Sequence, residues 1–156
     1  AAQFDFEVAV KGLNGQSLNE QWAETGPQAY SGTAISGYPN LLLLVGPNTG
    51  LGHNSIVHII ESQVNYVIDY LRILNSHDGS TYLDVKADAQ KAFNRDIQEK
   101  LATTGWQTGG CKSWYQTAEG KNTTLWPGST VKFRKMTRKV NLDDFNLITA
   151  DEKVSV

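Results

Sequence analysis

The sequence predicts an α/β fold in which a buried strand is followed by a long helix and then by an irregular, tryptophan-rich region. Leu41–Val45 is an apolar run without polar alternation, which is typical of a strand covered on both faces. Across Ser55–Asn75, apolar residues recur at spacings of three and four, which indicates an amphipathic helix. Trp106–Gly128 holds three of the four tryptophans and few aliphatic residues, so regular core elements are not expected there.

Two short elements are expected before the buried strand. Phe4–Val10 alternates apolar and acidic residues as a strand does, and Lys11–Gln16 supplies the glycines of a turn. Ser17–Thr25 fits a short helix that ends at Gly26 and Pro27.

The long helix is expected to begin at a polar cap and to bury one apolar stripe. Asn54 or Ser55 is the expected N-cap, since short polar side chains accept hydrogen bonds from the first free amides of a helix. The stripe expected to face the core consists of Ile56, Ile60, Val64, Val67, Leu71 and Leu74.

The rest of the chain continues this mixed pattern. His77–Val85 is typical of a turn followed by a short strand. A second amphipathic helix is indicated before Gly105, and Ser129–Lys139 fits a last helix. Residues 1–142 are therefore assigned to one domain, and residues 143–156 to a flexible tail. The apolar stripe of the second helix is Ala89, Phe93, Ile97 and Leu101.

Composition excludes several classes of protein. A formal net charge of -2 gives no general attraction to nucleic acid or to anionic lipid, and the longest apolar run is far too short to cross a membrane. The single cysteine, Cys111, cannot form an internal disulfide, so a cytoplasmic location is expected. The chain begins AAQFDF without an initiating methionine, which indicates a piece of something longer.

The glycine-rich segment Gly46–Ser55, GPNTGLGHNS, joins the expected strand to the long helix. Its glycines do not fit G-x-G-x-x-G, and no lysine follows as a P-loop requires, so both nucleotide fingerprints are absent. Glycine lets backbone approach a ligand closely, and a helix N-terminus favours an anion or a carbonyl that gains negative charge, such as one edge of a flavin. A purely structural strand-to-helix turn is the equal alternative.

Other polar residues form no recognisable cluster. His53 has no second histidine or cysteine nearby, so a metal site is not expected, and Cys111 fits an inert thiol better than a nucleophile. Asp143 and Asp144 are adjacent carboxylates that favour solvation. Lys132–Lys139 carries five basic residues in eight, which favours a solvated helix face, with contact to a phosphate of a partner or cofactor as the second interpretation.

Three motifs in the same order resemble the C-terminal part of the Baeyer-Villiger type flavin monooxygenases, the group that includes cyclohexanone and 4-hydroxyacetophenone monooxygenases. They are GTAISGYPNLLLLVGPNTGLGHNS, IESQVNYV and CKSWYQTAEGKNTTLWPG. The resemblance runs from about Phe4 to about Lys139. It implies the C-terminal portion of a two-dinucleotide-domain flavoprotein, in which residues 1–142 form an incomplete part of the FAD-binding monooxygenase domain.

The resemblance also implies site residues, position by position. Leu51, His53, Trp114 and Tyr115 would line the substrate pocket. Neither a catalytic residue nor a metal ligand is implied in this chain. The implied cofactor-binding positions are Gly46, Pro47, Asn48, Leu51, Gly52, His53, Asn54, Ser55, Ser113 and Trp114.

Two functions follow as expectations. The resemblance implies that the parent protein uses FAD, NADPH and O2 to insert oxygen into a ketone, or to oxygenate a heteroatom, through a C4a-peroxyflavin. The fragment alone is then expected to be inactive and to self-associate. The alternative is a small stand-alone α/β binding or interaction module that engages a partner through Trp106, Trp114 and Trp126.

Overall fold

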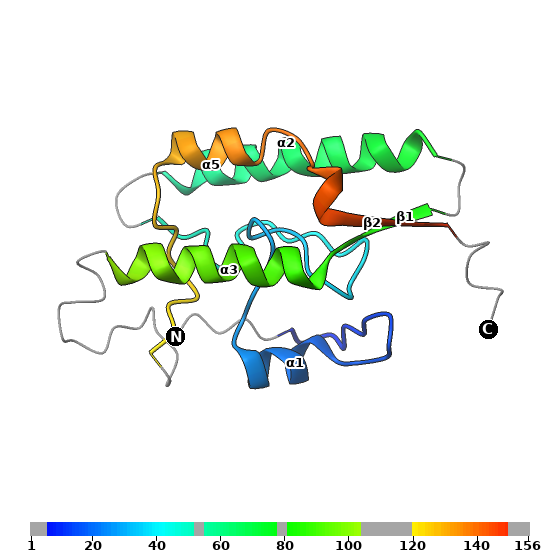
Figure 1. Cartoon of the computed structure of the whole chain (residues 1–156), viewed down its shortest axis with the longest axis horizontal. Helices are drawn as coiled ribbons and strands as arrows, with labels where there is room; N and C mark the ends of the chain where they lie inside the picture. Colours follow the sequence, from blue (N-terminus) through cyan, green and yellow to red (C-terminus); the bar gives the residue numbers. More distant parts are fainter. Residues whose placement is uncertain (1–5, 52–54, 78–80, 104–119, 150–156) are drawn as a thin grey trace.

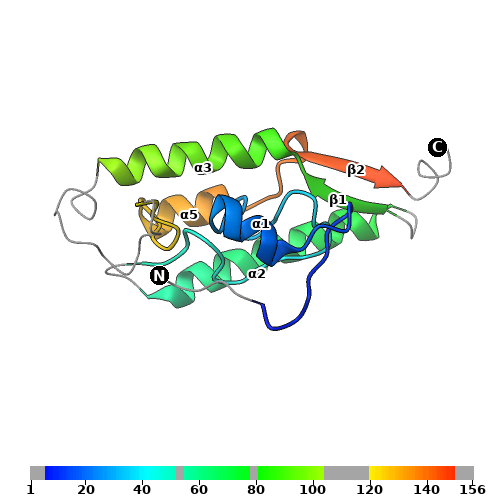
Figure 2. The same ribbon diagram turned by 90° about the horizontal axis from the view of Figure 1, so that it is seen from below.

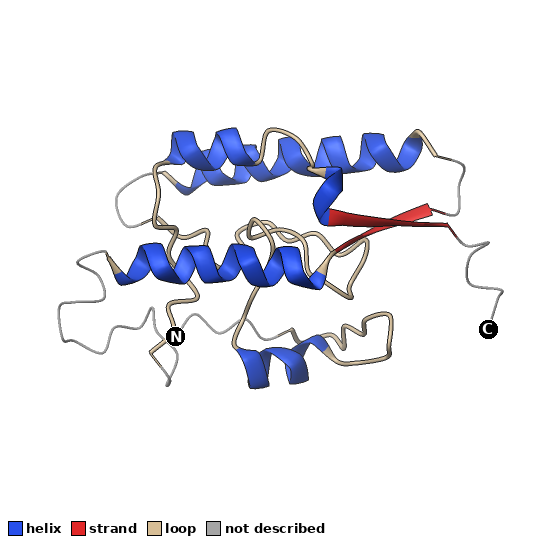
Figure 3. Cartoon of the chain, in the orientation of Figure 1, coloured by secondary structure: helices blue, strands red, loops and turns tan. Residues whose placement is uncertain are grey.

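The computed structural model describes residues 6–51, 55–77, 81–103 and 120–149 of the chain. These residues form a mixed fold of helices around one small antiparallel sheet (Figures 1 and 3). In chain order the elements are α1 (Leu18–Thr25), α2 (Ile56–Asn75), β1 (Thr81–Val85), α3 (Ala87–Ala102), α5 (Thr130–Met136), the 3-10 helix η1 (Leu142–Asp144) and β2 (Phe145–Thr149).

The long loop between α1 and α2 lies between α2 and α3, as Figures 1 and 2 show. Its backbone is bonded to polar side chains of both helices. Gln63 of α2 donates to the carbonyl of Gly32 at 2.9 Å, and from α3 the Gln90 side chain accepts from the amide of Ser36 at 2.8 Å. A buried backbone must find hydrogen-bond partners, and here side-chain amides supply them in place of neighbouring strands.

The segment Leu41–Val45 was expected to be a buried strand, and this is wrong. Leu42 forms one isolated bridge to Ala34, and Leu44 and Val45 are 50% and 38% exposed. Val45 has a φ of 56°, which an extended strand does not allow. The expected strand at Phe4–Val10 is also absent over residues 6–10, where Val8 is exposed.

The long helix has the expected bounds but buries a different face. Ser55 is its N-cap, and the Ser55 hydroxyl accepts from the amide of Val57 at 3.3 Å. None of the six residues of the expected stripe is buried, and Val64 and Leu71 are exposed. The inward face is rotated by roughly a quarter of a turn, because it meets loop backbone that needs polar partners. Its buried residues are Ile59, Ser62, Gln63, Tyr66 and Tyr70.

The C-terminal segment is not a loose tail over residues 142–149. β2 pairs with β1 in antiparallel register, with Phe145 opposite Val85. Phe145 is 5% exposed and makes edge contacts with the rings of Tyr30 and Tyr70 at centroid distances of 5.8 and 6.1 Å. Residues 150–156 lie outside the described part of the chain.

Asp144 is a hydrogen-bond acceptor rather than a merely solvated carboxylate. It accepts from the hydroxyl of Tyr30 at 2.5 Å and from the side chain of Asn141 at 2.9 Å. Burial and the contact with Asp144 raise the pKa of Tyr30, so this phenol stays protonated and donates. The contact ties the loop before α2 to the C-terminal strand.

The remaining helix and strand predictions are confirmed within the described residues. These are α1 with its end at Gly26, β1, α3 with Ile97 and Leu101 buried, and α5. Among the described residues, no helix combines the length and the apolar character that a membrane span requires.

We predict that Phe145→Ala lowers the free energy of unfolding by about 3–5 kcal/mol, because it removes a buried ring from the Tyr30 and Tyr70 contacts. Leu147→Ala is the matched control on the same strand, since Leu147 is 41% exposed, and it should cost less than about 1 kcal/mol. Urea denaturation of both variants gives the comparison. Equal losses would mean that Phe145 is not part of the core.

Candidate functional site

The segment Gly46–Leu51 leads toward the N-terminus of α2 and is bonded to residues 122–126. The amide of Asn48 donates to the carbonyl of Thr123 at 2.9 Å, and that of Gly50 donates to Thr124 at 2.8 Å. The carbonyl of Gly50 accepts from Trp126 at 2.8 Å, within a parallel bridge between Gly50 and Leu125. The loop is therefore held like one strand of a short ladder, although the two segments are far apart in sequence.

Asn48 is the side chain that locks this pairing. It has a φ of 57°, which asparagine tolerates better than most residues, and it is 4% exposed. Its side-chain nitrogen donates to the carbonyls of Asn122 at 2.8 Å and Leu125 at 3.0 Å. Both of its amide protons are thus used inside the protein, so Asn48 positions the loop rather than offering a donor to a ligand.

Two glycines allow close contact between the loop and the segment before it. A Cβ at Gly46 would lie 2.3 Å from the carbonyl oxygen of Gly32. A Cβ at Gly32 would lie 2.1 Å from the Cγ2 of Thr49, and Gly32 also has a φ of 64°. These glycines allow backbone segments of the chain to pack closely together. This agrees with the interpretation of the loop as a structural turn rather than as a ligand-binding loop.

Gln63 fixes the loop from the side of α2. Its side chain is fully buried; its nitrogen donates to the carbonyl of Gly32 and to the hydroxyl of Thr33, each at 2.9 Å. Its oxygen accepts from the amide of Val45 at 2.8 Å. One carboxamide therefore joins both arms of the loop to the helix, directly before Gly46.

The open side of the site is the N-terminal end of α2. Ser55 is exposed and Leu51 is half-buried against the core cluster that contains Ile59, whereas Gly46–Thr49 are buried. The first turn of α2 carries no acidic residue, so no side-chain carboxylate there offsets the partial positive charge of the helix end.

The structure brings five of the expected site residues into one loop and helix end, and the others fall outside the described residues. Those outside are Gly52, His53, Asn54, Ser113, Trp114 and Tyr115. Sequence reasoning missed Gly32, Gln63 and Asn122 as positioning residues. Gln63 lies in the motif IESQVNYV. A polar residue in the middle of a largely apolar helix was the sign that could have pointed to its role.

Comparison of this chain with known proteins identifies relatives by sequence and by fold. No family model matches the chain. The chain is 46% identical over 139 residues to a Baeyer-Villiger monooxygenase of Streptomyces coelicolor, an alignment that covers 89% of this chain and 27% of the relative. The resemblance to the Baeyer-Villiger type flavin monooxygenases is confirmed. The chain spans about a quarter of the length of the curated relatives it matches.

Solved structures of Baeyer-Villiger monooxygenases share the fold. Cyclohexanone monooxygenase from Rhodococcus sp. Phi1, bound to NADP+, has a TM-score of 0.77 at 20% identity, over 92% of this chain and 27% of that one. The OTEMO complex with FAD and NADP has a TM-score of 0.71 at 22% identity, over 90% of this chain and 27% of that one. The fold class is therefore confirmed as that of the C-terminal part of these enzymes.

We predict that Gly32→Ala destabilises the chain by about 1–3 kcal/mol more than Gly15→Ala does. The two glycines have similar φ values, 64° and 73°, but a Cβ at Gly15 meets nothing within 4 Å. Both substitutions carry the cost of a positive φ, so their difference in unfolding free energy reports the contacts of the new Cβ, which lies 2.1 Å from the Cγ2 of Thr49 and 3.0 Å from the carbonyl oxygen of Pro47. Adding Thr49→Ser to Gly32→Ala should recover part of that difference, and no recovery would contradict the close contact.

Proposed function

We propose that this chain is part of an FAD- and NADPH-dependent monooxygenase that inserts oxygen into ketones or oxygenates heteroatoms. The observation that carries the proposal is the 46% identity over 139 residues to a Baeyer-Villiger monooxygenase. The position of the loop adds support, because Leu51 packs against the same core cluster as Ile56, the first residue of α2, and Ser55 caps this helix.

The described residues fit a flavin at this helix end. Bound FAD would supply the redox chemistry that activates O2 after reduction by NADPH. Ser55 and the first turn of α2 would hold the flavin edge that gains negative charge, since no carboxylate stands in that turn. Leu51 would provide an apolar wall for the substrate. Asn48 and Gln63 would keep the loop in place and its buried part free of water.

No observation favours the alternative of an interaction module with a tryptophan-rich face. Trp126 is 8% exposed, packs edge-on against Phe133 at 5.2 Å and donates its indole N–H to the carbonyl of Ser129. It belongs to the core rather than to a contact surface. Trp106 and Trp114 lie outside the described residues.

A chimera tests the proposed function directly. We would replace the matching segment of the Streptomyces coelicolor relative with this chain. The purified chimera is expected to retain yellow FAD and to oxidise NADPH in a ketone-dependent way, with ester products detected by mass spectrometry. The 156-residue chain alone should be colourless and inactive. A folded chimera that holds FAD but yields neither ester nor oxygenated thioether would contradict the proposal.

Within the same chimera, Ser55→Asp places a carboxylate at the open end of α2 without removing the cap, since aspartate caps helices as well as serine does. The added negative charge should slow reduction of the flavin by NADPH and leave the melting temperature unchanged or higher. Ser129→Asp is the matched control, because Ser129 caps α5 in the same way. Equal effects from the two substitutions would remove Ser55 from the flavin site.

We also propose that the isolated chain self-associates through the outer face of α2. Val57, Val64, Ile68 and Leu71 are 54%, 39%, 40% and 53% exposed and lie along one side of this helix. Contiguous exposed apolar surface of this kind drives association. Sedimentation equilibrium at micromolar concentration should show a dimer or larger species, and Val64→Ser with Leu71→Gln should shift it to 17.2 kDa. A wild-type monomer would refute this.

A further inference from the structure

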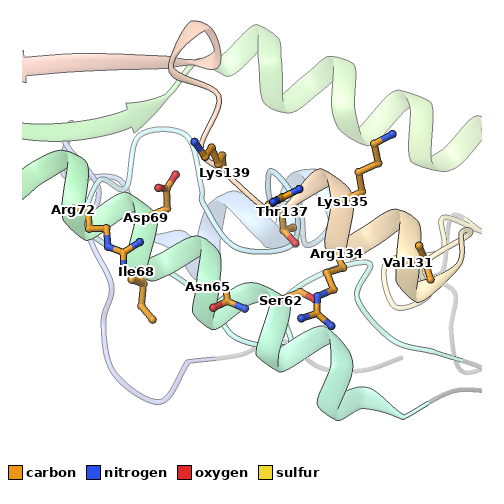
Figure 4. Close-up of a pocket in the computed structure, with 11 residues that line it drawn as sticks. Ser62, Asn65, Ile68, Asp69, Arg72, Val131, Arg134, Lys135, Thr137 and Lys139 are labelled. Atoms are coloured by element: carbon orange, nitrogen blue, oxygen red, sulfur yellow. The ribbon is translucent and has the colours of Figure 1, made fainter.

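A groove of about 610 Å³ separates α2 from the segment that runs from α5 to Lys139 (Figure 4). Its walls include apolar residues of both elements, Ile68 from α2 and Val131 from α5. None of the described loop residues 46–51 lines it, so the groove is separate from the proposed flavin site and does not depend on the proposed function. Its charged lining residues are Asp69, Arg72, Arg134, Lys135, Arg138 and Lys139.

The groove concentrates positive charge in a chain whose formal net charge is -2. Five cationic side chains line it against the single carboxylate of Asp69. One oxygen of that carboxylate already accepts from the amide of Val140 at 2.8 Å. The ion pairs formed among the described residues are His58 with Glu61 and Lys100 with Asp96, so none of the five cations is neutralised by a described carboxylate.

The neutral hydroxyl groups of the groove are engaged elsewhere. Ser62 donates to the carbonyl of His58 at 2.7 Å, and Thr137 donates to that of Phe133 at 2.9 Å. Donors for a ligand therefore come from the cations and from the side-chain amide of Asn65. In Figure 4, Arg134 extends toward α2 beside Ser62, whereas Lys135 points away from α2. Arg134 also borders a smaller hollow of about 220 Å³ on the other side of Ser62.

Three of the five cations are arginines, which suits phosphate. Guanidinium groups bind phosphate oxygens through two parallel N–H donors, and several such groups along one groove favour an anion that carries more than one charge. The volume matches a small molecule. We propose that the groove between α2 and α5 binds a small anion that carries at least two phosphoryl groups.

Calorimetric titration of the 156-residue chain with pyrophosphate at 50 mM salt tests the proposal. We expect saturable one-to-one binding that weakens as salt is raised, and binding of monophosphate at least tenfold weaker. Arg134→Gln with Arg138→Gln should weaken pyrophosphate binding by about tenfold or more. Both arginines are exposed, so the melting temperature should stay within a few degrees of wild type.

Lys91→Gln with Arg95→Gln is the matched control. It removes the same charge from exposed positions of α3, outside the groove, and should leave the affinity unchanged within about twofold. Equal weakening by the two double variants would show that net charge alone attracts pyrophosphate, and would overturn the site. Absence of binding at millimolar pyrophosphate, or equal affinity for hexaglutamate, would also overturn it.

Discussion

The buried carboxamide of Gln63 is the interaction on which the rest of this structure depends. It contacts Gly32, Thr33 and Val45 from the middle of α2, and it has no exposure to solvent. The loop that it holds carries buried backbone groups but forms no regular sheet, so turns, isolated bridges and side chains share the task of pairing them. Gln90 and Asn94 of α3 contribute in the same way from the opposite side. Side-chain amides therefore replace the missing strands between the two helices.

The helices were predictable because the spacing of apolar residues that indicates a helix can be read from a short stretch of sequence. α2, α3 and α5 were each indicated by spacing or by caps, and the structure gives them close to the expected bounds. The prediction of a strand at Leu41–Val45 was wrong because an apolar run indicates burial but does not indicate which segments cover it. The positive φ values of Asn40 and Val45 break the extended backbone at both ends of this run, and the four leucines between them do not reveal it. The β2 strand was missed because its pairing with β1 joins residues 60 or more positions apart.

The sequence indicated the segment that we propose as the site, but it did not indicate the contacts that hold this segment in place. The resemblance placed the loop at Gly46–Ser55, and the structure sets that loop at the N-terminal end of α2. The anchoring of Asn48 by Asn122 and Leu125 joins segments 74 and 77 residues apart, and one sequence carries no record of such pairing. Asn122–Thr124 was recognisable only as part of the third motif of the resemblance, which says nothing of its part in holding the loop. The motif therefore indicated which segment to propose as the site, while the hydrogen bonds that hold this segment were visible only in the fold.

The apolar stripe of α2 was assigned to the wrong face because this helix has three different faces: one toward the loop, one toward the groove and one exposed. Gln63, Tyr66 and Tyr70 face the loop, and Arg72 faces the groove shared with α5. Val57, Val64 and Leu71 fall on neither face and stay exposed at spacings of seven residues. The inward face of α2 combines Ile59 and two tyrosines with the polar Ser62 and Gln63, so part of the apolar sequence of this helix lies outside the core. Hydrophobic periodicity alone therefore did not identify the inward face of α2, because the loop backbone needs hydrogen-bond partners and Gln63 supplies them from that face.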